Sequence, residues 1–310
     1  MPTLPITIVI CTHNRSELLM HAISSINASI RPSDCEISIM VVANACSDAT
    51  VAELDNYIKN QAEGTIPLVY FEEPQAGKSF ALNLALSKLE RGFTCFIDDD
   101  QRVDSNFLVG MTNTLSTYPD CSFFCGNLIP DWTGEEASWI HDTGPYRVFP
   151  LPVPHFDPGN QVKCLTLDDD LPSGGNLIIK TDLLNKIGDF EVKLGPQGHN
   201  LMGGEDSEYV RRILNSGATL IYSPDITQYH YVDPDRLRLR YLITLSFQRS
   251  RAITLVNNPQ RAPIPRYIWR KLFNYSANIL FSLSLQKKRF YLMRFAATLG
   301  EATGFTSSSK

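Results

Sequence analysis

Three consecutive aspartates follow a short apolar run in the first half of the chain. Residues 94–97 are typical of a buried strand, and Asp98, Asp99 and Asp100 come directly after them. Adjacent carboxylates repel one another, so a cation is needed to offset the cost of holding them together. Asp98 and Asp100 are two residues apart and can converge on one side of an extended turn. This spacing favours a hard divalent ion, Mg²⁺ or Mn²⁺, that also binds a diphosphate. The alternative is a solvated acidic turn that caps a helix beginning at Ser105.

A second acidic motif, Gly203-Gly204-Glu205-Asp206, opens a helix expected over residues 205–215. A carboxylate at the start of a helix is often only a cap. The two glycines give this segment a flexible approach, however, and a carboxylate that reaches an acceptor hydroxyl can act as a general base. Both interpretations remain open on these residues alone.

A Gly-Lys-Ser sequence at residues 77–79 has the end of a phosphate-binding P-loop. That loop requires a glycine five residues before Gly77, and the residue there is Glu72. The P-loop is therefore excluded. Lys78 remains a candidate for a diphosphate contact at a strand-to-helix turn, and the alternative is a solvated lysine near the helix start.

Strands and helices alternate through the first hundred residues. Apolar, β-branched runs predict strands over 6–11, 37–43, 67–71 and 94–97, and helical spacing predicts helices over 17–30, 48–62 and 79–90. This alternation predicts an α/β fold with a doubly wound, mainly parallel sheet. Ligands of such sheets bind beyond the carboxyl ends of the strands, where the aspartates and Lys78 lie.

The second half of the chain is less regular. Residues 130–158 are rich in proline and predict a long irregular excursion. Strands are expected over 177–180 and 219–223, the latter ending at Pro224, and the pattern is helical from Leu237 onward. Seven scattered cysteines without zinc-site spacing indicate reduced thiols and a reducing compartment, and no signal peptide is visible at the N-terminus.

Charge is divided unevenly along the 310 residues. Residues 236–310 hold 14 of the 28 Lys and Arg but one of the 33 acids, a net charge of +13, so the first 235 residues carry −18. In this basic segment, an apolar stripe at helical spacing contains Ile268, Leu272, Tyr275, Ile279 and Leu283, widened by Trp269, Phe273 and Leu280. The apolar interval between Lys271 and Lys287 has 15 residues, short of the ~20 that a spanning helix needs.

The basic segment therefore predicts an interfacial helix on an anionic membrane. The alternative is a helical hairpin packed on the catalytic sheet with its bases in solvent. Nucleic acid is a weak candidate because the body of the protein is acidic and no recognisable binding module is present.

Seven segments together resemble the family-two glycosyltransferases of the GT-A type, in their order and spacing. They are VICTHNR (9–15), VVANACSDAT (41–50), GKSFALN (77–83), FIDDD (96–100), SGGNLIIKTDLLNKIGDFE (173–191), GGEDSEYVRR (203–212) and YSPDITQYHYV (222–232). The resemblance covers the chain from its start to about Val232.

The resemblance implies a role for each matching residue. A base and ribose pocket is implied at Thr12, Asn14, Arg15, Asn44 and Asp48. Asp98 and Asp100 match a DxD pair that holds the metal, with Asp100 as the direct ligand, and the donor-binding set also includes Lys78, Asp98 and Asp99. The donor-sugar and acceptor region is implied at Gly174, Gly175 and Asn176. Asp206 matches the catalytic base, with Glu205 as its supporting neighbour, and His230 matches a histidine that completes the metal or diphosphate site in some relatives. The alternative for His230 is a purely structural histidine.

Two departures from the family pattern concern the nucleotide base. The family usually has Pro-Thr-Tyr-Asn-Arg where this chain has Cys11-Thr12-His13-Asn14-Arg15, and an acid where this chain has Ala43. That acid commonly contacts uracil, so a strict preference for uridine is not expected unless Asn44 replaces the contact.

The resemblance implies an inverting glycosyltransferase of the hexosyltransferase class that uses a divalent metal, Mn²⁺ or Mg²⁺. We expect a catalytic domain over residues 1–235, with a nucleotide-sugar-binding half (1–128) and an acceptor half (129–235), followed by a helical extension (236–310). The expected reaction moves a sugar from a nucleotide diphosphate sugar to a saccharide or lipid-linked saccharide acceptor in surface glycan synthesis, at the cytoplasmic face of the plasma membrane. A nucleotidyltransferase of similar fold and a catalytically silent membrane scaffold are the alternatives.

Overall fold

A computed structural model describes residues 4–61, 63–149, 151–192, 205–258 and 260–307. The chain divides into two compact units. The sheet unit contains Met1–Asp131 and Pro154–Tyr231, and the helical unit contains Trp132–Val153 and Val232–Lys310. The sequence placed a domain boundary at residue 235. The structure groups the irregular segment 132–153 with the C-terminal helices instead.

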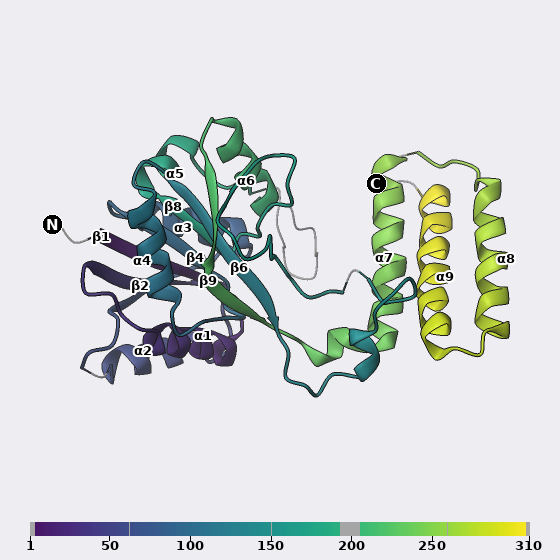
Figure 1. Cartoon of the computed structure of the whole chain (residues 1–310), viewed down its shortest axis with the longest axis horizontal. Helices are drawn as coiled ribbons and strands as arrows, with labels where there is room; N and C mark the ends of the chain where they lie inside the picture. Colours follow the sequence, from purple (N-terminus) through teal and green to yellow (C-terminus); the bar gives the residue numbers. More distant parts are fainter. Residues whose placement is uncertain (1–3, 62, 150, 193–204, 259, 308–310) are drawn as a thin grey trace. The chain divides into compact units, whose positions relative to one another are not determined.

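A nine-stranded mixed sheet forms the centre of the sheet unit (Figure 1). Its order is β3-β2-β1-β4-β8-β6-β9-β5, and β7 pairs with β9 off this path. The strands are β1 (Leu4–Thr12), β2 (Cys35–Asn44), β3 (Leu68–Glu73), β4 (Phe93–Ile97), β5 (Gln101–Val103), β6 (Phe123–Asp131), β7 (Lys163–Leu165), β8 (Asn176–Lys180) and β9 (Leu220–Tyr231). Pairing is parallel from β3 to β4 and between β6 and β9, and antiparallel elsewhere. The expected α/β class is confirmed.

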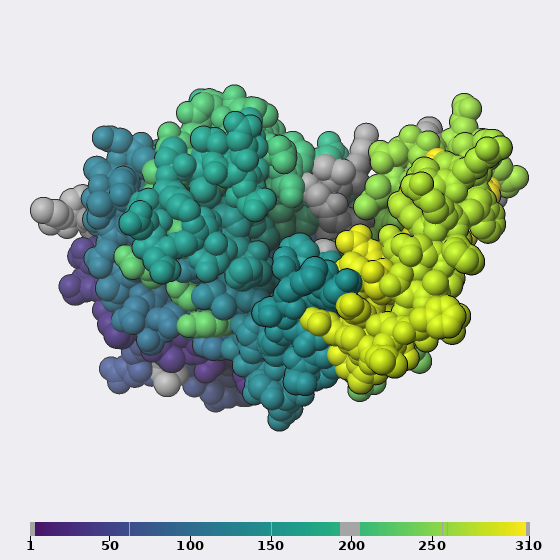
Figure 2. Space-filling view, turned by 45° about the vertical axis from the view of Figure 1, so that its right-hand side comes forward, coloured from purple at the N-terminus to yellow at the C-terminus, as the bar shows by residue number. Residues whose placement is uncertain are grey.

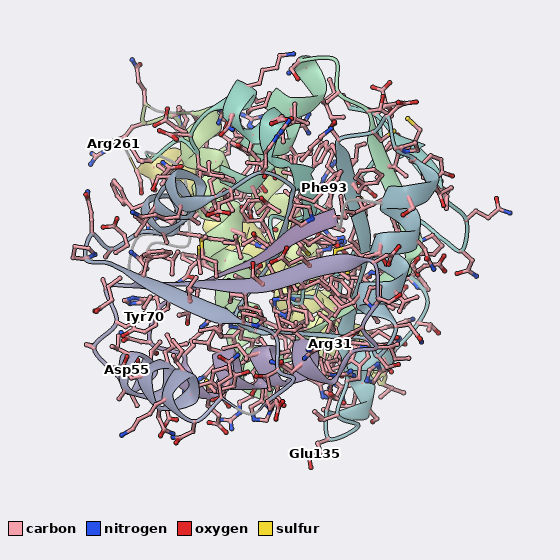
Figure 3. All side chains as sticks on the ribbon, turned by 90° about the vertical axis from the view of Figure 1, so that its left-hand side faces the viewer. Arg31, Asp55, Tyr70, Phe93, Glu135 and Arg261 are labelled. Atoms are coloured by element: carbon pink, nitrogen blue, oxygen red, sulfur yellow. The ribbon has the colours of Figure 1, made fainter. Side chains whose placement is uncertain are left out.

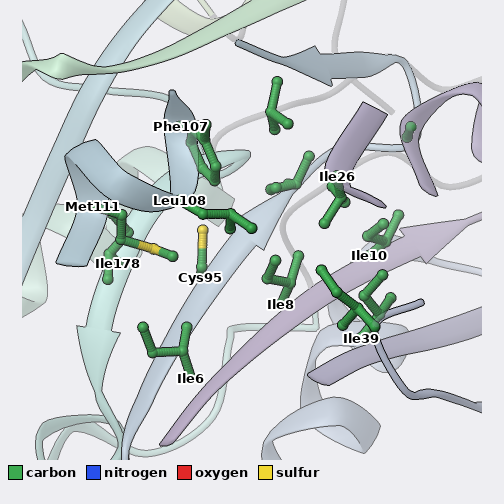
Figure 4. Packing of buried hydrophobic residues seen from close by; sticks show 14 of the residues in the cluster. Ile6, Ile8, Ile10, Ile26, Ile39, Cys95, Phe107, Leu108, Met111 and Ile178 are labelled. Atoms are coloured by element: carbon green, nitrogen blue, oxygen red, sulfur yellow. The ribbon is translucent and has the colours of Figure 1, made fainter. Parts of the chain in front are cut away.

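Helices cover both faces of this sheet, as doubly wound connectivity requires. They are α1 (Ser16–Ala28), α2 (Thr50–Lys59), α3 (Lys78–Lys88), α4 (Phe107–Thr117), α5 (Thr181–Ile187) and α6 (Glu205–Asn215). One core cluster joins α1, α2 and α4 to alternate residues of the central strands, including Ile6, Ile8 and Cys95 (Figure 4). A second cluster joins α3, α5 and α6 to the intervening residues, such as Val9 and Phe96. The unbroken apolar runs of β1 and β4 are therefore buried on both faces.

The parallel register brings the carboxyl ends of three strands to one edge of the sheet. Thr12 at the end of β1 pairs with Ala43 near the end of β2. Val9 of β1 pairs with Phe96, so β4 ends at Ile97 beside them. The polar residues that follow these strands consequently lie close together.

The edge strand β3 is joined to the helix before it in sequence. The Tyr70 hydroxyl donates to Asp55 Oδ1 of α2 at 2.6 Å (Figure 3). This hydrogen bond to Asp55 raises the pKa of Tyr70 to about 12. The contact fixes α2, and hence the loop that leads from β2 into it, against the edge of the sheet.

Strand β9 is longer than the sequence predicted. The prediction ended the strand at Pro224, which is wrong, because β9 continues to Tyr231. Its pairing with β6 shifts between Cys125 and Asn127, so Pro224 lies where the ladder is interrupted and no N–H is required. Gly126 permits this close approach, since a Cβ there would lie 1.9 Å from the Ile226 carbonyl oxygen. The extension carries His230 into register with Gln101, next to the aspartates.

The helical unit is built on three helices, α7 (Leu239–Asn257), α8 (Arg266–Phe281) and α9 (Leu285–Thr306), with α9 between the other two (Figure 1). The backbones of α7 and α9 approach closely at two glycines. A Cβ on Gly300 would lie 2.1 Å from the Phe247 carbonyl oxygen, and one on Gly304 would lie 2.5 Å from Thr254 Cβ. No helix in the described ranges is long and apolar enough to cross a membrane.

Segment 132–153 contributes to the core of the helical unit. It contains a short 3₁₀ helix, η1 (Ser138–His141), and a second one, η2 (Pro234–Leu237), precedes α7. Ile140 and Val148 are buried with Leu242 of α7. Arg289 of α9 lies 3.7 Å from Asp142 and packs over the Trp139 ring. These contacts explain why a segment remote in sequence belongs to this unit.

Candidate active site

A cavity of about 310 Å³ opens at the carboxyl ends of β1, β2 and β4. Its lining includes residues from the polar segments singled out in the sequence, namely Thr12, Arg15, Asn44, Lys78, Asp98, Asp99, Asp100 and His230. Gly174 and Asp206 line a smaller adjoining pocket together with Lys78 and Asp98. Of the other predicted residues that the structure describes, Asn14, Asp48, Gly175, Asn176 and Glu205 line neither space. The parallel register therefore assembles most of the expected donor-binding residues, which come from four separate loops and from β9.

Two cations compensate the three aspartates, Arg15 for Asp99 and Asp100 and Lys78 for Asp98. The buried Asp99 accepts from Thr12 Oγ1 at 2.7 Å and from Arg15 Nη1 at 2.9 Å. Arg15 Nη1 also lies 2.9 Å from Asp100 Oδ2, and Lys78 Nζ lies 3.0 Å from Asp98 Oδ1. Arg15 and Lys78 thus offset the mutual repulsion expected from the positions of the carboxylates in the sequence.

Burial and charge act oppositely on these carboxyl groups. Burial raises the pKa of Asp99 to about 6, although Arg15 opposes the shift. Burial also raises the pKa of Asp98, but the paired Lys78 outweighs it and holds that pKa below its usual value. For Lys78 itself, burial lowers the pKa, while Asp206 and Asp98 together raise it well above the usual value. Lys78 is therefore a fixed positive charge inside the cavity.

Lys78 joins the aspartate turn to the start of α6. Its Nζ lies 3.4 Å from Asp206 Oδ2, as well as close to Asp98. Asp206 Oδ1 is buried and has no hydrogen-bond donor within the described part of the chain. Glu205 beside it is buried, and Gly203 and Gly204 lie outside the described residues. One oxygen of Asp206 is therefore held by a cation, and the other is available to accept a proton.

Two glycines make room for the carboxylates. A Cβ on Gly174 would lie 2.1 Å from Asp206 Oδ1, and a Cβ on Gly175 would lie 2.4 Å from Asp98 Oδ2. Neighbouring Asn176 is buried, and its side chain exchanges hydrogen bonds with the Gly126 backbone at 2.5 and 3.0 Å. The glycines thus determine where both carboxylates lie, and Asn176 anchors their segment to β6.

Asn14 and Asp48 bind backbone rather than the cavity. Asn14 Oδ1 accepts from the backbone N–H groups of Ser47 and Asp48, at 2.7 and 3.2 Å. Asp48 accepts from the backbone N–H groups of Thr50 and Ser16 at the starts of α2 and α1. Both side chains hold the loops that border the site.

Asn44 is buried, and its side-chain amide makes three hydrogen bonds. Its Nδ2 donates to the carbonyls of Glu73 and Gln75, at 3.2 and 2.7 Å, and its Oδ1 accepts from the Gly77 N–H at 2.8 Å. The amide therefore fixes the loop before α3. Both Nδ2 protons are used, and Oδ1 already accepts one hydrogen bond, so the amide is held by this loop rather than directed at a nucleotide base.

Two polar residues that the sequence did not single out, His13 and Gln101, also reach the site. His13 lines the cavity, and its Nδ1 lies 2.6 Å from the Asn44 carbonyl, which leaves Nε2 as the other polar atom of the ring. Gln101 Oε1 accepts from the Asp98 N–H at 3.1 Å, and its buried Nε2 has no partner in the described ranges. The only signal in the sequence was position, since His13 lies within the 9–15 segment and Gln101 directly follows the aspartates.

The chemistry of Asp100 and His230 fits a divalent metal. Within the described residues, no three His, Cys, Asp or Glu side chains form a complete metal cluster. Mg²⁺ is usually held by one or two carboxylates, with substrate phosphates and water as further ligands. His230 Nδ1 lies 2.8 Å from the Tyr231 carbonyl, which assigns the ring proton to Nδ1. Nε2 lies 3.3 Å from Asp100 Oδ1, so an imidazole nitrogen and a carboxylate oxygen, both ligands of divalent cations, lie side by side.

Known structures of similar fold include two complexes with nucleotides. S. aureus TarS 1–349 in complex with UDP has a TM-score of 0.54 and 15% identity, over 97% of this chain and 90% of that one. The mannosyltransferase PcManGT from Pyrobaculum calidifontis, in complex with GDP-Man and Mn²⁺, has a TM-score of 0.57 and 16% identity, over 96% and 87%. This chain spans 44% of the longer S. aureus TarS structure. The expected GT-A-type fold is confirmed.

Sequence comparison agrees with the fold. The succinoglycan biosynthesis protein ExoM of Rhizobium meliloti (strain 1021) is 23% identical over 247 residues, which are 79% of this chain and 73% of that protein. The family model for glycosyl transferase family 2 matches residues 7–179, more than half of the chain. The match contains the aspartate turn, Lys78 and both glycines of the site. The chain therefore belongs to glycosyl transferase family 2.

Proposed function

We propose that this protein is an inverting, metal-dependent hexosyltransferase. It moves a sugar from a nucleoside diphosphate sugar to a saccharide or lipid-linked saccharide during surface glycan synthesis. One observation carries the proposal: Lys78 joins Asp98, on the donor side of the site, to Asp206, whose second oxygen is buried without a donor. The similarity to a succinoglycan biosynthesis protein supports the acceptor class. The UDP, UDP-GlcNAc and GDP-Man bound to proteins of similar fold support the donor class.

The roles of the side chains follow from this arrangement. Asp98 and Asp100 would hold the divalent ion, with His230 next to Asp100, and the ion would supply positive charge near the leaving diphosphate. Lys78 adds a second, permanent positive charge on the same side. Thr12 and Arg15 orient Asp99 and thereby the whole aspartate turn. Asn44 holds the loop that carries Lys78.

Asp206 is the general base in this mechanism. It removes the acceptor hydroxyl proton as the acceptor oxygen bonds to the anomeric carbon of the donor. The bond between that carbon and the diphosphate oxygen breaks, and its electron pair leaves with the nucleoside diphosphate. A single displacement on the face opposite the leaving group inverts the anomeric centre.

The proposal places the protein at the cytoplasmic face of the plasma membrane as a peripheral protein. The basic segment 236–310, with its net charge of +13, supports an anionic membrane surface as partner. A lipid-linked acceptor would be presented at the same surface.

Replacing the base tests the proposal. Asp206→Asn should retain donor binding and lose turnover by roughly two or more orders of magnitude, the scale expected when a general base is removed. Asp182→Asn is a matched control, because Asp182 is the second residue of α5 as Asp206 is of α6, but it is exposed and is not in the small pocket that Asp206 lines with Lys78 and Asp98. Binding is measured by calorimetric titration with UDP or GDP plus Mn²⁺, and turnover by nucleoside diphosphate release. An Asp206→Asn protein with wild-type turnover would remove Asp206 from the mechanism, and release of pyrophosphate would indicate a nucleotidyltransferase instead.

A further inference from the structure

Helix α8 packs in the helical unit through the apolar stripe that the sequence singled out. Ile268 is buried, and Leu272, Tyr275 and Ile279 are half-buried. Tyr275 lies against Tyr291 of α9, with ring centroids 5.7 Å apart. These four residues follow one another at helical spacing and face the bundle. They are core packing, so a surface for membrane binding has to be sought on another side of the helix.

A second set of apolar side chains points into solvent. Trp269, Phe273 and Leu280 follow at intervals of four and seven residues, which places them along one line of α8. Three more exposed apolar residues follow: Phe281 at the end of α8, Leu283 in the turn, and Leu285 at the start of α9. We call these six residues the outer strip, and their exposed fractions are Trp269 59%, Phe273 80%, Leu280 72%, Phe281 82%, Leu283 101% and Leu285 66%. In Figure 2 the yellow-green α8 is turned toward the viewer on the right-hand side.

Such a strip is costly in water. Fully burying one side chain of this size contributes about 1.5–3 kcal/mol, so six of them left exposed favour an apolar partner strongly. Contiguous exposed apolar patches are rare on soluble monomers and usually mark a binding surface. The strip therefore indicates a partner whose contact surface is itself apolar.

The charges around the strip identify that partner. Arg266 and Arg270 are exposed beside it on α8, and Lys287 and Lys288 follow it at the start of α9. Between Arg236 and Glu301 the sequence contains no acid. Glu301 itself accepts from the Tyr267 hydroxyl at 2.5 Å and lies 3.4 Å from Lys271, so its charge is balanced within the unit. An apolar strip flanked by bases is complementary to anionic lipid, whose headgroups are negative and whose chains are apolar.

A second copy of the chain fits this surface less well. In a two-fold symmetric dimer the same patch would face itself, and the flanking bases of both copies would meet across helices α8 that contain no acid. A bilayer presents no such repulsion.

We propose that α8 lies in the plane of an anionic bilayer, with the outer strip inserted among the acyl chains and the flanking bases at the headgroups. Trp269 would then contact the outer part of the acyl chains just below the headgroups, where tryptophan is favoured. A helix of 16 residues extends about 24 Å along the surface. Membrane binding would give the enzyme access to a membrane-held acceptor, and in this respect the inference rests on the proposed function. Its test needs neither donor nor acceptor, so the two proposals can fail separately.

Vesicle binding by the full-length protein tests the proposal. Vesicles of equal parts phosphatidylglycerol and phosphatidylcholine should bind the protein, and pure phosphatidylcholine should bind it at least tenfold more weakly. Phe273→Ser should weaken binding to the anionic vesicles by about tenfold. The matched control is Ile253→Ser, because Ile253 is an apolar residue of α7 with 62% exposure that is not in the strip. The double variant Arg266→Gln/Arg270→Gln should weaken vesicle binding by roughly fivefold for each base removed, and this binding should depend less on salt.

Tryptophan fluorescence locates the inserted side. The chain has three tryptophans, so Trp132→Phe with Trp139→Phe leaves Trp269 as the reporter. Its emission should shift to the blue on anionic vesicles and be quenched by lipids brominated in the acyl chains. If the protein binds vesicles but Trp269 stays unquenched, the proposal is overturned. The same holds if Phe273→Ser and Ile253→Ser lose affinity for the anionic vesicles equally. Concentration-dependent dimerisation without vesicle binding would show that a second copy covers the strip. Ile253, Arg266, Arg270 and Phe273 are exposed, so circular dichroism and Tm should be unchanged in the variants of these residues.

Discussion

A single methyl group at residue 174 should separate binding from catalysis. In Gly174→Ala the new Cβ would lie 2.1 Å from Asp206 Oδ1, 2.3 Å from Cγ and 2.6 Å from Oδ2. Ordinary contact requires about 3.5 Å, so the carboxylate has to retreat by more than about 1 Å. Gly174 does not have a positive φ, so the backbone accommodates alanine and only the contact changes.

The expected loss follows from this displacement. A shift of about 1 Å in a catalytic group costs on the order of 10²-fold in rate. Turnover of Gly174→Ala should therefore fall about a hundredfold, while the affinity for UDP or GDP with Mn²⁺ stays within about threefold. The unfolding temperature should change little, because the side chain of Asp206 can rotate away from the methyl group at the expense of its contact with Lys78.

Gly175→Ala provides the contrast. Its Cβ would lie 2.4 Å from Asp98 Oδ2 and 2.7 Å from Gln101 Nε2, so it disturbs the aspartate turn instead. Calorimetric titration should show a clear loss of metal-dependent nucleotide affinity for this variant. Both variants should be assayed with the same donor for release of nucleoside diphosphate. Identical effects of the two substitutions on binding and turnover would refute the division of the site into a donor side and a base side.

Other predictions concern the metal, the nucleotide base and the charge inside the cavity. Asp100→Ala should abolish metal-dependent nucleotide binding and keep the fold, since Arg15 still pairs with Asp99; unchanged affinity in calorimetry would exclude Asp100 as a ligand. The affinities of uridine, guanosine and thymidine diphosphates should differ by less than tenfold, about 1.4 kcal/mol, because the Ala43 side chain has no hydrogen-bond acceptor and the Asn44 amide is hydrogen-bonded to the next loop. A hundredfold preference for uridine in competition binding would show that another group reads the base. Lys78→Met should weaken nucleoside diphosphate binding more than nucleoside binding, and equal effects on both ligands would remove Lys78 from the diphosphate site.

The parallel half of the sheet and its helices were predictable because their signals are local. Continuous β-branched runs such as β1 indicate strands buried on both faces, and the helical spacing of α1 indicates one apolar side. β9 was cut short because proline normally ends a central strand, and the shifted register that tolerates Pro224 depends on Gly126 about a hundred residues earlier in the chain. Non-local pairing of this kind leaves no trace in a short window of sequence.

The site shows the same limit. The aspartate turn and Lys78 were identified from their types and their place after a strand. That Lys78 contacts both Asp98 and Asp206 could not be inferred from the residues, since Asp206 is 128 positions away. The environment of Asn44 was equally hidden: its amide was a candidate for reading the base, yet three backbone groups of the next loop engage it. Local chemistry identifies candidate residues, whereas only the fold shows which of their atoms are already bound.

The stereochemistry of donor hydrolysis tests the central claim most directly, and it requires no knowledge of the natural acceptor. The protein is incubated with Mn²⁺ and the α-linked nucleoside diphosphate sugar that best raises its unfolding temperature. Proton NMR then records the first-formed anomer of the released sugar before mutarotation. A single displacement by a water activated by Asp206 predicts the β-anomer together with nucleoside diphosphate, and both signals should be lost in Asp206→Asn. First formation of the α-anomer, or release of nucleoside monophosphate, would contradict the mechanism.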